Sequence, residues 1–333
     1  MDALCWQADT PPYAFNGSAR KVDQMSSMGI VRKDWTPGQL TADPSAYVGR
    51  KVAIFGGTGG LGRAISEALI QKGAAVTVLG RVLKDAPHPG RTFVAADFSS
   101  LVQTRDVAQR LAAETFDAIL LTHGIFASRV REVTPEGLEK DLATSALSRW
   151  VIVRETAGRL GRQRPAGGKR PRLFVWGFPG GERQLDFTDV QSARNYRWST
   201  AHGNTVVINE ALVRDTVTKF PEVDVFGMNP GIIKTNIMAG VLGQSSLVLR
   251  VQQALVGLLF QSAETYAKKI APLVVHPELE HRSGALFNRH AKPIEPNPWL
   301  LAADNSARVA AAADALVASV LAPRPSSQPK APH

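Results

Sequence analysis

KVAIFGGTGGLGRAISEALI, residues 51–70, is the stretch that decides the fold of this chain. Its first five residues form a short apolar run, which predicts a strand buried on both faces of a sheet. Between Leu61 and Leu69 apolar residues recur every three or four positions, and this spacing predicts a helix with one apolar face. Three glycines between the strand and the helix allow a tight turn there: Gly56, Gly60 and Gly62.

The rest of the chain repeats this alternation of strand and helix. Gly73 ends the first helix, and the apolar run at 75–79 predicts a second strand, which completes a βαβ unit. Further strands are predicted at 92–96, 117–122, 172–177 and 224–229, and further helices at 101–113, 138–158, 199–219 and 263–275. This series predicts an α/β fold, a doubly wound parallel sheet of the Rossmann type, in a single domain.

We expect three parts along the chain. Residues 1–47 contain paired prolines and no sustained periodicity, so they are predicted to form an N-terminal arm laid on the domain surface. The Rossmann domain is predicted to span 48–308. Residues 309–333 are predicted to hold the end of a helix and then a proline-rich, disordered tail.

The composition narrows the class of protein. With 333 residues and 44% apolar residues, the chain is not disordered throughout. No apolar run approaches the roughly 18 residues that cross a bilayer, and the first 30 residues lack a secretion signal, so we predict a cytoplasmic protein. Cys5 is the single cysteine, which excludes an internal disulfide, and we expect no metal site.

The net charge of +10 is concentrated in one segment. Residues 149–172 hold eight Lys or Arg and one acid, Glu155. The part at 161–172 has no aromatic residue that could stack on bases, so a nucleic-acid groove is excluded. Its Gly, Pro and Arg content predicts a solvated loop, and docking to an anionic membrane or partner is the alternative.

The glycine turn has the setting of a dinucleotide-binding loop. It follows a predicted buried strand and opens a helix, whose free amides and dipole favour a pyrophosphate. At the end of the second strand, where an acid would hold the ribose 2′-hydroxyl of NAD, the chain has Gly80 and Arg81. Because a guanidinium is suited to a 2′-phosphate, we predict NADP (NADPH) as cofactor, held by Arg81 and by Arg63 of the glycine loop.

Taken together, these motifs resemble the short-chain dehydrogenase/reductase family. The stretch SAETYAKKIAPLVVHPELEHRSGALF at 262–287 resembles its last helix and strand, nearest to the retinol-dehydrogenase-like members. The pattern Gly56-x-x-x-Gly60-x-Gly62 matches the family's glycine loop, AADFSS at 95–100 its adenine-binding turn, and NPGIIKT at 229–235 its segment after the sixth strand. THG at 122–124 keeps only the last glycine of the family's Asn-Asn-Ala-Gly turn. The resemblance implies further cofactor-binding residues: Thr58, Leu61, Asp97, Phe98, Gly124, Pro230, Gly231 and Thr235.

The family's catalytic serine, tyrosine, lysine and asparagine are not kept. Ser145 stands at the asparagine position, and Gly177 and Phe178 stand at the serine position. The Tyr-x-x-x-Lys step has two alignments, one pairing Tyr196 with Thr200 and one pairing Trp198 with His202. Tyrosine acts as an acid or base only where a nearby cation lowers its pKa. We predict Tyr196 as the acid, supported by His202 and Ser145, and a structural role for Tyr196 is the alternative.

Several neighbouring residues have two interpretations. His123, after the fourth strand, is either a packed residue or a catalytic one. Trp176 and Phe178 form either an aromatic floor beside the nicotinamide or ordinary core. The apolar stretch 242–260 lies where family members carry a mobile lid, and it also suits a membrane or oligomer contact.

The sequence therefore predicts an NADP(H)-dependent oxidoreductase acting on a carbonyl or alcohol of a fairly apolar small molecule. The rival hypothesis is a non-catalytic NADP(H) sensor or scaffold that has lost the Ser-Tyr-Lys machinery. The resemblance also implies a homodimer formed through the helices at 138–158 and 199–219, although Arg149 and Arg154 make this pairing uncertain.

Overall fold

A computed structural model describes residues 29–38, 43–164, 168–231, 233 and 261–322. Eight strands form one sheet in the order β3-β2-β1-β4-β5-β6-β7-β8, in which only the β7–β8 pair is antiparallel. This confirms the predicted doubly wound parallel sheet. The strands are β1 (Lys51–Phe55), β2 (Ala75–Gly80), β3 (Arg91–Ala95), β4 (Ala118–Leu121), β5 (Arg172–Trp176), β6 (Asp224–Met228), β7 (Leu286–Phe287) and β8 (Pro293–Ile294).

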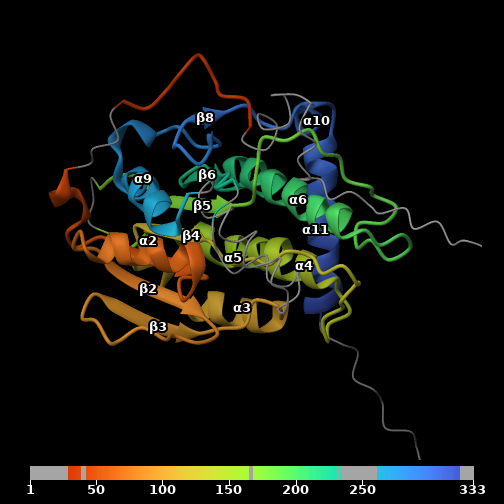
Figure 1. Ribbon diagram of the computed structural model, residues 1–333, viewed down its shortest axis with the longest axis horizontal. Helices are drawn as coiled ribbons and strands as arrows, with labels where there is room; N and C mark the ends of the chain where they lie inside the picture. The colour runs from red at the N-terminus through yellow and green to blue at the C-terminus, as the bar shows by residue number, and fades with distance from the viewer. Residues whose placement is uncertain (1–28, 39–42, 165–167, 232, 234–260, 323–333) are drawn as a thin grey trace, which may run out of the picture.

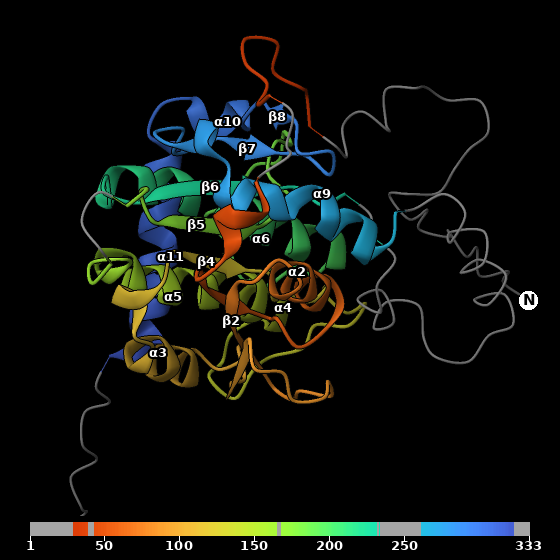
Figure 2. The ribbon, with the colours of Figure 1, turned by 90° about the vertical axis from the view of Figure 1, so that its left-hand side faces the viewer.

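Helices cover both faces of the sheet (Figures 1 and 2). On one face α2 (Gly60–Ile70) packs against α9 (Ala263–Val275). The other face is covered by α3 (Leu101–Arg110), α4 (Lys140–Leu142), a π-helical turn η3 (Ala143–Leu147), α5 (Ser148–Thr156) and α6 (Trp198–Lys219). The remaining elements are η1 (Pro44–Tyr47), η2 (Ala113–Thr115), η4 (Ala157–Arg159), η6 (Pro277–Leu279), α10 (Pro298–Leu301) and α11 (Asn305–Leu321).

Each face of the sheet carries its own apolar core. Alternate residues of the central strands point to opposite faces, so Ile54 packs with α2 and α9 while Phe55 packs with the α3 and α5 layer. The largest fully buried side chain is Trp150 of α5. These cores hold the strand ends in place, and the loops at the carboxyl ends of the strands form the candidate site.

The N-terminal arm lies on the domain where it is described. Val31 forms an antiparallel bridge to Ile294 of β8, and the ring of Trp35 meets that of Phe287 edge-on, with centroids 6.1 Å apart. Tyr47 is fully buried in the core beside α2. The arm is therefore an extension of the sheet's last edge, as far as the described residues reach.

The predicted domain boundary at residue 308 lies inside the carboxyl-terminal helix α11. It is one continuous helix, Asn305–Leu321, that packs across α6, α3 and α5 (Figure 1). Asp314 accepts hydrogen bonds from Trp150 Nε1 at 2.5 Å and from Arg154, and it lies 3.6 Å from Lys219 Nζ. The helix thus belongs to the domain and covers part of α5 and α6, the helices predicted to pair in a homodimer.

The part of the basic segment predicted as a loop, 161–171, forms no helix or strand where it is described, but the basic segment 149–172 as a whole is not solvated. It comprises most of α5, the turn η4, a connection and the start of β5. Arg149 and Arg172 are buried. Five of the eight cations form ion pairs with carboxylates elsewhere in the domain: Arg154, Arg159, Arg164, Arg170 and Arg172. Internal pairing therefore accounts for most of the local charge.

No helix among the described residues is long and apolar enough to cross a membrane.

Candidate active site

The glycine loop connects β1 to α2, and Gly62 packs closely against Thr122, the residue that follows β4. Gly56 and Gly60 have φ values of +88° and +49°, which favour glycine. A Cβ atom on Gly62 would lie 2.3 Å from Thr122 Oγ1 and 2.4 Å from the Gly56 carbonyl oxygen, so glycine there lets α2 approach β4. Gly59 precedes the helix without any side-chain cap, and its own Cβ would meet nothing within 4 Å.

This cradle fits a pyrophosphate. The first N–H groups of a helix have no partner within the helix, and here the residues that carry them are Gly60, Leu61 and Gly62. With no side chain capping them, they remain open to an anion, which the helix dipole also favours. Thr58 lies in the same turn, with its hydroxyl beside the end of β2 at Gly80.

The end of β2 has a cation and no acid. A Cβ on Gly80 would lie 2.4 Å from Thr58 Oγ1, so any side chain at this position requires the Thr58 side chain to move. Arg81 follows, is exposed and makes no ion pair within the described parts of the chain. Arg63 is paired with Asp85 at 2.6 Å. Of the two predicted phosphate-binding arginines, Arg81 is therefore the one without a carboxylate partner among the described residues.

The predicted adenine turn follows β3. Asp97 is half-buried, and its Oδ1 accepts hydrogen bonds from the backbone N–H and hydroxyl of Ser99. Phe98 is 6% exposed and stacks on His123, with centroids 4.5 Å apart. The Phe98 side chain thus belongs to the core, and only its backbone faces the cofactor edge.

Gly124, after β4, lies against a buried cation. A Cβ there would lie 3.0 Å from Arg149 Nη2 and 3.2 Å from Ser145 Oγ. Arg149 Nη2 donates to the His123 carbonyl oxygen. Burial lowers the pKa of the Arg149 guanidinium to about 9, opposed by the charge of Asp141. The sequence analysis did not assign this arginine to the site.

His123 is a packed residue. Its Nε2 lies 2.9 Å from Ser148 Oγ, and that hydroxyl donates to the Thr144 carbonyl, so Nε2 carries the proton. Burial, followed by the charge of Arg149, holds the pKa of His123 well below its usual range. This neutral, buried ring matches the structural interpretation of His123.

A buried carboxylate joins two of the predicted catalytic residues. Asp141 Oδ1 accepts from Ser145 Oγ at 2.5 Å, and Asp141 Oδ2 lies 2.8 Å from His202 Nδ1. The Ala127 backbone N–H also donates to Oδ2, at 3.1 Å. Since a carboxylate only accepts, His202 Nδ1 carries a proton, and Nε2 on the far side of the ring is left for a substrate. His202 is 18% exposed and Asp141 is 0% exposed.

Asp141 is not among the site residues predicted from the sequence, although its spacing from Ser145 contains a signal. Asp141 and Ser145 are four residues apart on a helical segment and so lie on the same side. The segment continues through the π-helical turn of η3, a feature common at functional sites. His202 comes from α6, and nothing local in the sequence indicates that it reaches Asp141.

Tyr196 has contacts that oppose proton transfer. It precedes α6, and its hydroxyl donates to the Ser128 carbonyl oxygen at 2.7 Å. Burial, with the nearby charges of Glu139 and Asp141, raises the pKa of Tyr196 to about 12. The tyrosine of a working acid needs the reverse shift. These contacts favour His202, at the lysine position of the second alignment, over Tyr196.

Two aromatic rings flank His202. The Phe126 ring lies 4.3 Å from the imidazole, and the Phe178 ring lies 6.1 Å from it, centroid to centroid. Phe178 has a φ of +54°, a strained value for a residue other than glycine. Trp176 instead points into the opposite core, where its Nε1 donates to Tyr266. The predicted aromatic floor is therefore corrected to Phe126 and Phe178.

The turn after β6 completes the described site. Asn229 Oδ1 accepts from the Gly231 backbone N–H at 3.0 Å, and Asn229 Nδ2 donates to the Pro179 carbonyl. This ties Pro230 and Gly231 to the segment that carries Phe178. Thr235 and the predicted lid at 242–260 lie outside the described residues.

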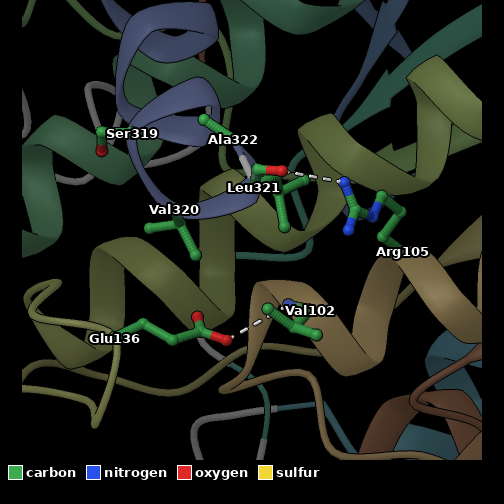
Figure 3. A pocket seen from close by; sticks show the side chains of 7 residues that line it. All are labelled: Val102, Arg105, Glu136, Ser319, Val320, Leu321 and Ala322. Carbon is green, nitrogen blue, oxygen red and sulfur yellow. Dashed lines mark hydrogen bonds between the residues drawn. The ribbon is translucent and has the colours of Figure 1, made fainter. Parts of the chain in front are cut away.

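A hollow between α3 and the end of α11 offers no comparable chemistry (Figure 3). Its one carboxylate, Glu136, accepts from the backbone N–H groups of Leu101 and Val102 at the start of α3. Arg105 donates to the Leu321 carbonyl. These polar groups are engaged in holding α3 and α11.

The site thus lies where strand order reverses in a doubly wound sheet. The predicted cofactor-binding residues lie at one edge of the sheet, where they follow β1, β2, β3, β4 and β6. Thr235 is the exception, because it lies outside the described residues. Gly124 and Ser145 bring this edge next to the His202 and Asp141 pair. Doubly wound folds of the Rossmann type bind dinucleotides at such an edge, and this arrangement is typical of their oxidoreductases.

Comparisons with known proteins agree with this class. No model of a known protein family matches the chain. Over 253 residues it is 42% identical to "Uncharacterized oxidoreductase YKL107W" of Saccharomyces cerevisiae, covering 75% of this chain and 82% of that protein. Over 279 residues it is 25% identical to retinol dehydrogenase 14 of Homo sapiens, covering 74% of this chain and 80% of that protein.

Solved structures share the fold. A short-chain dehydrogenase of Salmonella enterica aligns with a TM-score of 0.56 at 15% identity, covering 75% of this chain and 99% of that one. A short-chain type dehydrogenase/reductase of Mycobacterium ulcerans aligns with a TM-score of 0.52 at 14% identity, covering 77% and 94%.

The chain belongs to the short-chain dehydrogenase/reductase family, oxidoreductases that use a nicotinamide cofactor on small molecules. The relatives are named as oxidoreductases, which gives the non-catalytic alternative no support.

Proposed function

We propose that this protein is an NADP(H)-dependent oxidoreductase that interconverts a carbonyl and an alcohol on a fairly apolar small molecule, with His202 in place of the family's tyrosine as the proton-transferring group. The observation that carries the proposal is the Asp141–His202 contact of 2.8 Å at the cofactor edge. The active site is therefore an atypical one for this family.

His202 has the surroundings of a general acid and base. Asp141 fixes the ring through Nδ1, which leaves Nε2 to exchange a proton with the substrate oxygen. During reduction, Nε2 gives a proton to the carbonyl oxygen, and during oxidation it takes the proton back. A bound nicotinamide supplies or accepts the hydride at carbon.

Ser145 supports the proton transfer by His202. Its hydroxyl donates to Asp141 and its oxygen accepts from the Ile125 backbone N–H, so it holds Asp141 against His202. Phe126 and Phe178 line the approach to Nε2 with apolar surface, which favours an apolar substrate.

NADP is favoured over NAD by the end of β2. Gly80 supplies no carboxylate for a ribose 2′-hydroxyl, and Arg81, exposed and without an ion pair among the described residues, can pair with a 2′-phosphate. The remaining cofactor contacts are proposed to come from the glycine loop, from Asp97 and from the turns that hold Gly124 and Gly231.

The test compares His202→Gln with Tyr196→Phe in NADPH oxidation against a panel of aromatic and aliphatic ketones and aldehydes. We expect His202→Gln to lose at least about 100-fold in turnover, since a positioned general acid contributes about 10²–10⁴-fold. NADPH binding, followed by calorimetry, should persist. Tyr196→Phe should leave turnover little changed.

Two results would overturn the proposal. Loss of turnover in Tyr196→Phe with retention in His202→Gln would return the acid to Tyr196. Tight NADPH binding with no oxidation on any carbonyl of the panel would favour the sensor hypothesis. A cytoplasmic location and the oligomeric state stay predictions from the sequence.

A further inference from the structure

Three side chains of one helical segment hold the chain that follows β4. Asp141, Ser145 and Arg149 are four residues apart along α4, η3 and α5, so they lie on the same side of this segment. They bind alternate residues of the segment 123–127, which is neither helix nor strand. We call these three side chains and their contacts the β4 clamp.

Each side chain of the β4 clamp makes a hydrogen bond with the backbone. Arg149 Nη2 donates to the His123 carbonyl oxygen, the Ile125 N–H donates to Ser145 Oγ at 2.9 Å, and the Ala127 N–H donates to Asp141 Oδ2 at 3.1 Å. The segment is therefore fixed at every second residue, and Gly124 and Phe126 lie between the fixed points.

The two residues between the fixed points belong to the candidate site. Gly124 is a predicted cofactor-binding residue after β4, and the Phe126 ring lies 4.3 Å from the His202 imidazole, centroid to centroid. The backbone N–H and C=O groups of Gly124 and Phe126 have no hydrogen-bond partner among the described residues. These groups are therefore left for a bound cofactor or substrate.

Arg149 is the member of the β4 clamp that lies against Gly124. A Cβ atom on this glycine would lie 3.0 Å from Arg149 Nη2, so the guanidinium packs directly on the backbone there. Arg149 is 4% exposed. Burying a cation is costly, and an apolar side chain of similar length would avoid the cost. A cation retained at this point favours a role in the site over a role in stability.

We propose that Arg149 is a positioning residue of the proposed reaction. By holding the carbonyl oxygen of His123, it keeps the backbone of Gly124 in place at the cofactor edge. The proposal rests on the proposed function only for the identity of the cofactor, because the β4 clamp is present in the protein alone.

The experiment compares three variants of the full chain. Arg149→Met removes the charge and the donors while keeping an unbranched side chain, and Arg149→Lys keeps the charge and a donor. Arg154→Met is the matched control, because it removes a cation from the same helix that pairs with Asp215 and Asp314 instead. Arg149→Met should fold, since the His123 ring keeps its contact with Ser148.

Two readouts report on the β4 clamp. Hydrogen–deuterium exchange of the backbone amides at 122–128, followed without cofactor, measures how firmly the segment is held. Calorimetric titration measures NADPH affinity, and urea unfolding reports the stability of each variant.

We expect exchange at the Ile125 and Ala127 amides to rise about tenfold in Arg149→Met, because losing a charge-assisted hydrogen bond frees the start of the segment. NADPH affinity should fall about tenfold in the same variant. Arg149→Lys should recover part of both losses. Arg154→Met should unfold at lower urea, with wild-type exchange at 122–128 and wild-type NADPH affinity.

Three results overturn the proposal: wild-type exchange at 122–128 in Arg149→Met, wild-type NADPH affinity in that variant, or the same losses in Arg154→Met. The last result would show that the stability of α5 alone controls the segment. If the wild type binds no NADPH, the proposed function fails, while the exchange measurement still tests the β4 clamp.

Discussion

Substituting Gly62 by alanine should damage the cofactor site through the backbone. The new Cβ would lie 2.3 Å from Thr122 Oγ1 and 2.4 Å from the Gly56 carbonyl oxygen. The threonine cannot turn away freely, because its hydroxyl donates to the Phe55 carbonyl at 2.9 Å. Contact at about 3.5 Å therefore requires α2 to move by about 1 Å from β4.

Overpacking of this kind costs about 1–3 kcal/mol of unfolding free energy. The movement also displaces the amides of Gly60 and Leu61 from the pyrophosphate position, so we expect NADPH affinity to fall about tenfold or more, which corresponds to about 1.4 kcal/mol. Urea unfolding measures the first quantity and calorimetric titration with NADPH measures the second.

Gly59→Ala is the matched control for this experiment. Its backbone is extended, with φ −158° and ψ 165°, and its Cβ would meet nothing within 4 Å. Without a clash, stability should fall by less than about 1 kcal/mol, because the poor N-cap preference of alanine is partly offset by the lower freedom of its unfolded chain. Wild-type stability and NADPH affinity in Gly62→Ala would refute the close packing of α2 on β4 that this reasoning requires.

Three further predictions concern the cofactor edge, α11 and alkaline pH. Arg81→Ala should weaken NADPH binding about tenfold or more and leave NADH binding unchanged in calorimetry; an unaltered preference would contradict the assignment of Arg81. Asp314→Ala should lower the unfolding free energy in urea by about 1–3 kcal/mol, because Trp150 Nε1 loses its acceptor, and no loss would show that α11 packs loosely. Burial raises the pKa of Tyr47 to about 12. Below about pH 10 its hydroxyl is neutral in both the folded and the unfolded state. As the pH rises from about 10 toward 12 the unfolded state loses the proton first, so the free energy of unfolding should fall. Unfolding curves between pH 8 and 11 test this, and Tyr47→Phe should flatten the decline.

The fold was predictable because local signals and the global arrangement agree. Each buried parallel strand is an apolar run, and helices α2, α3 and α9 have an apolar stripe at helical spacing. The helix predicted at 263–275 has those bounds in the structure. Helix α11 was predicted only as an end because its alanine-rich sequence has a weak stripe, and its packing depends on Asp314 meeting Trp150, 164 residues away.

The sequence could also place the predicted cofactor residues at one sheet edge, since they follow the strands directly. The contact of Asp141 with His202, which carries the proposed proton transfer, could not be predicted, because it joins residues 61 positions apart on different helices. For a related reason, the charge pattern of residues 149–172 predicted more solvent exposure than the structure shows. Composition counts the cations of a segment but not the carboxylates that fold against them, such as Asp117 for Arg164.

The departures from the family's catalytic pattern are physically linked. A lysine at position 202 would lie beside Asp141, a fully buried carboxylate, and would form an ion pair with it. His202 in its place carries a proton on Nδ1 toward Asp141 and keeps a second nitrogen for a substrate. The permanent cation of the site is Arg149 on α5, whose charge and that of Asp141 act on each other in the buried interior. Asp141 therefore lies between a buried cation on α5 and an imidazole on α6, and removing its carboxylate would leave the Arg149 charge buried without that partner.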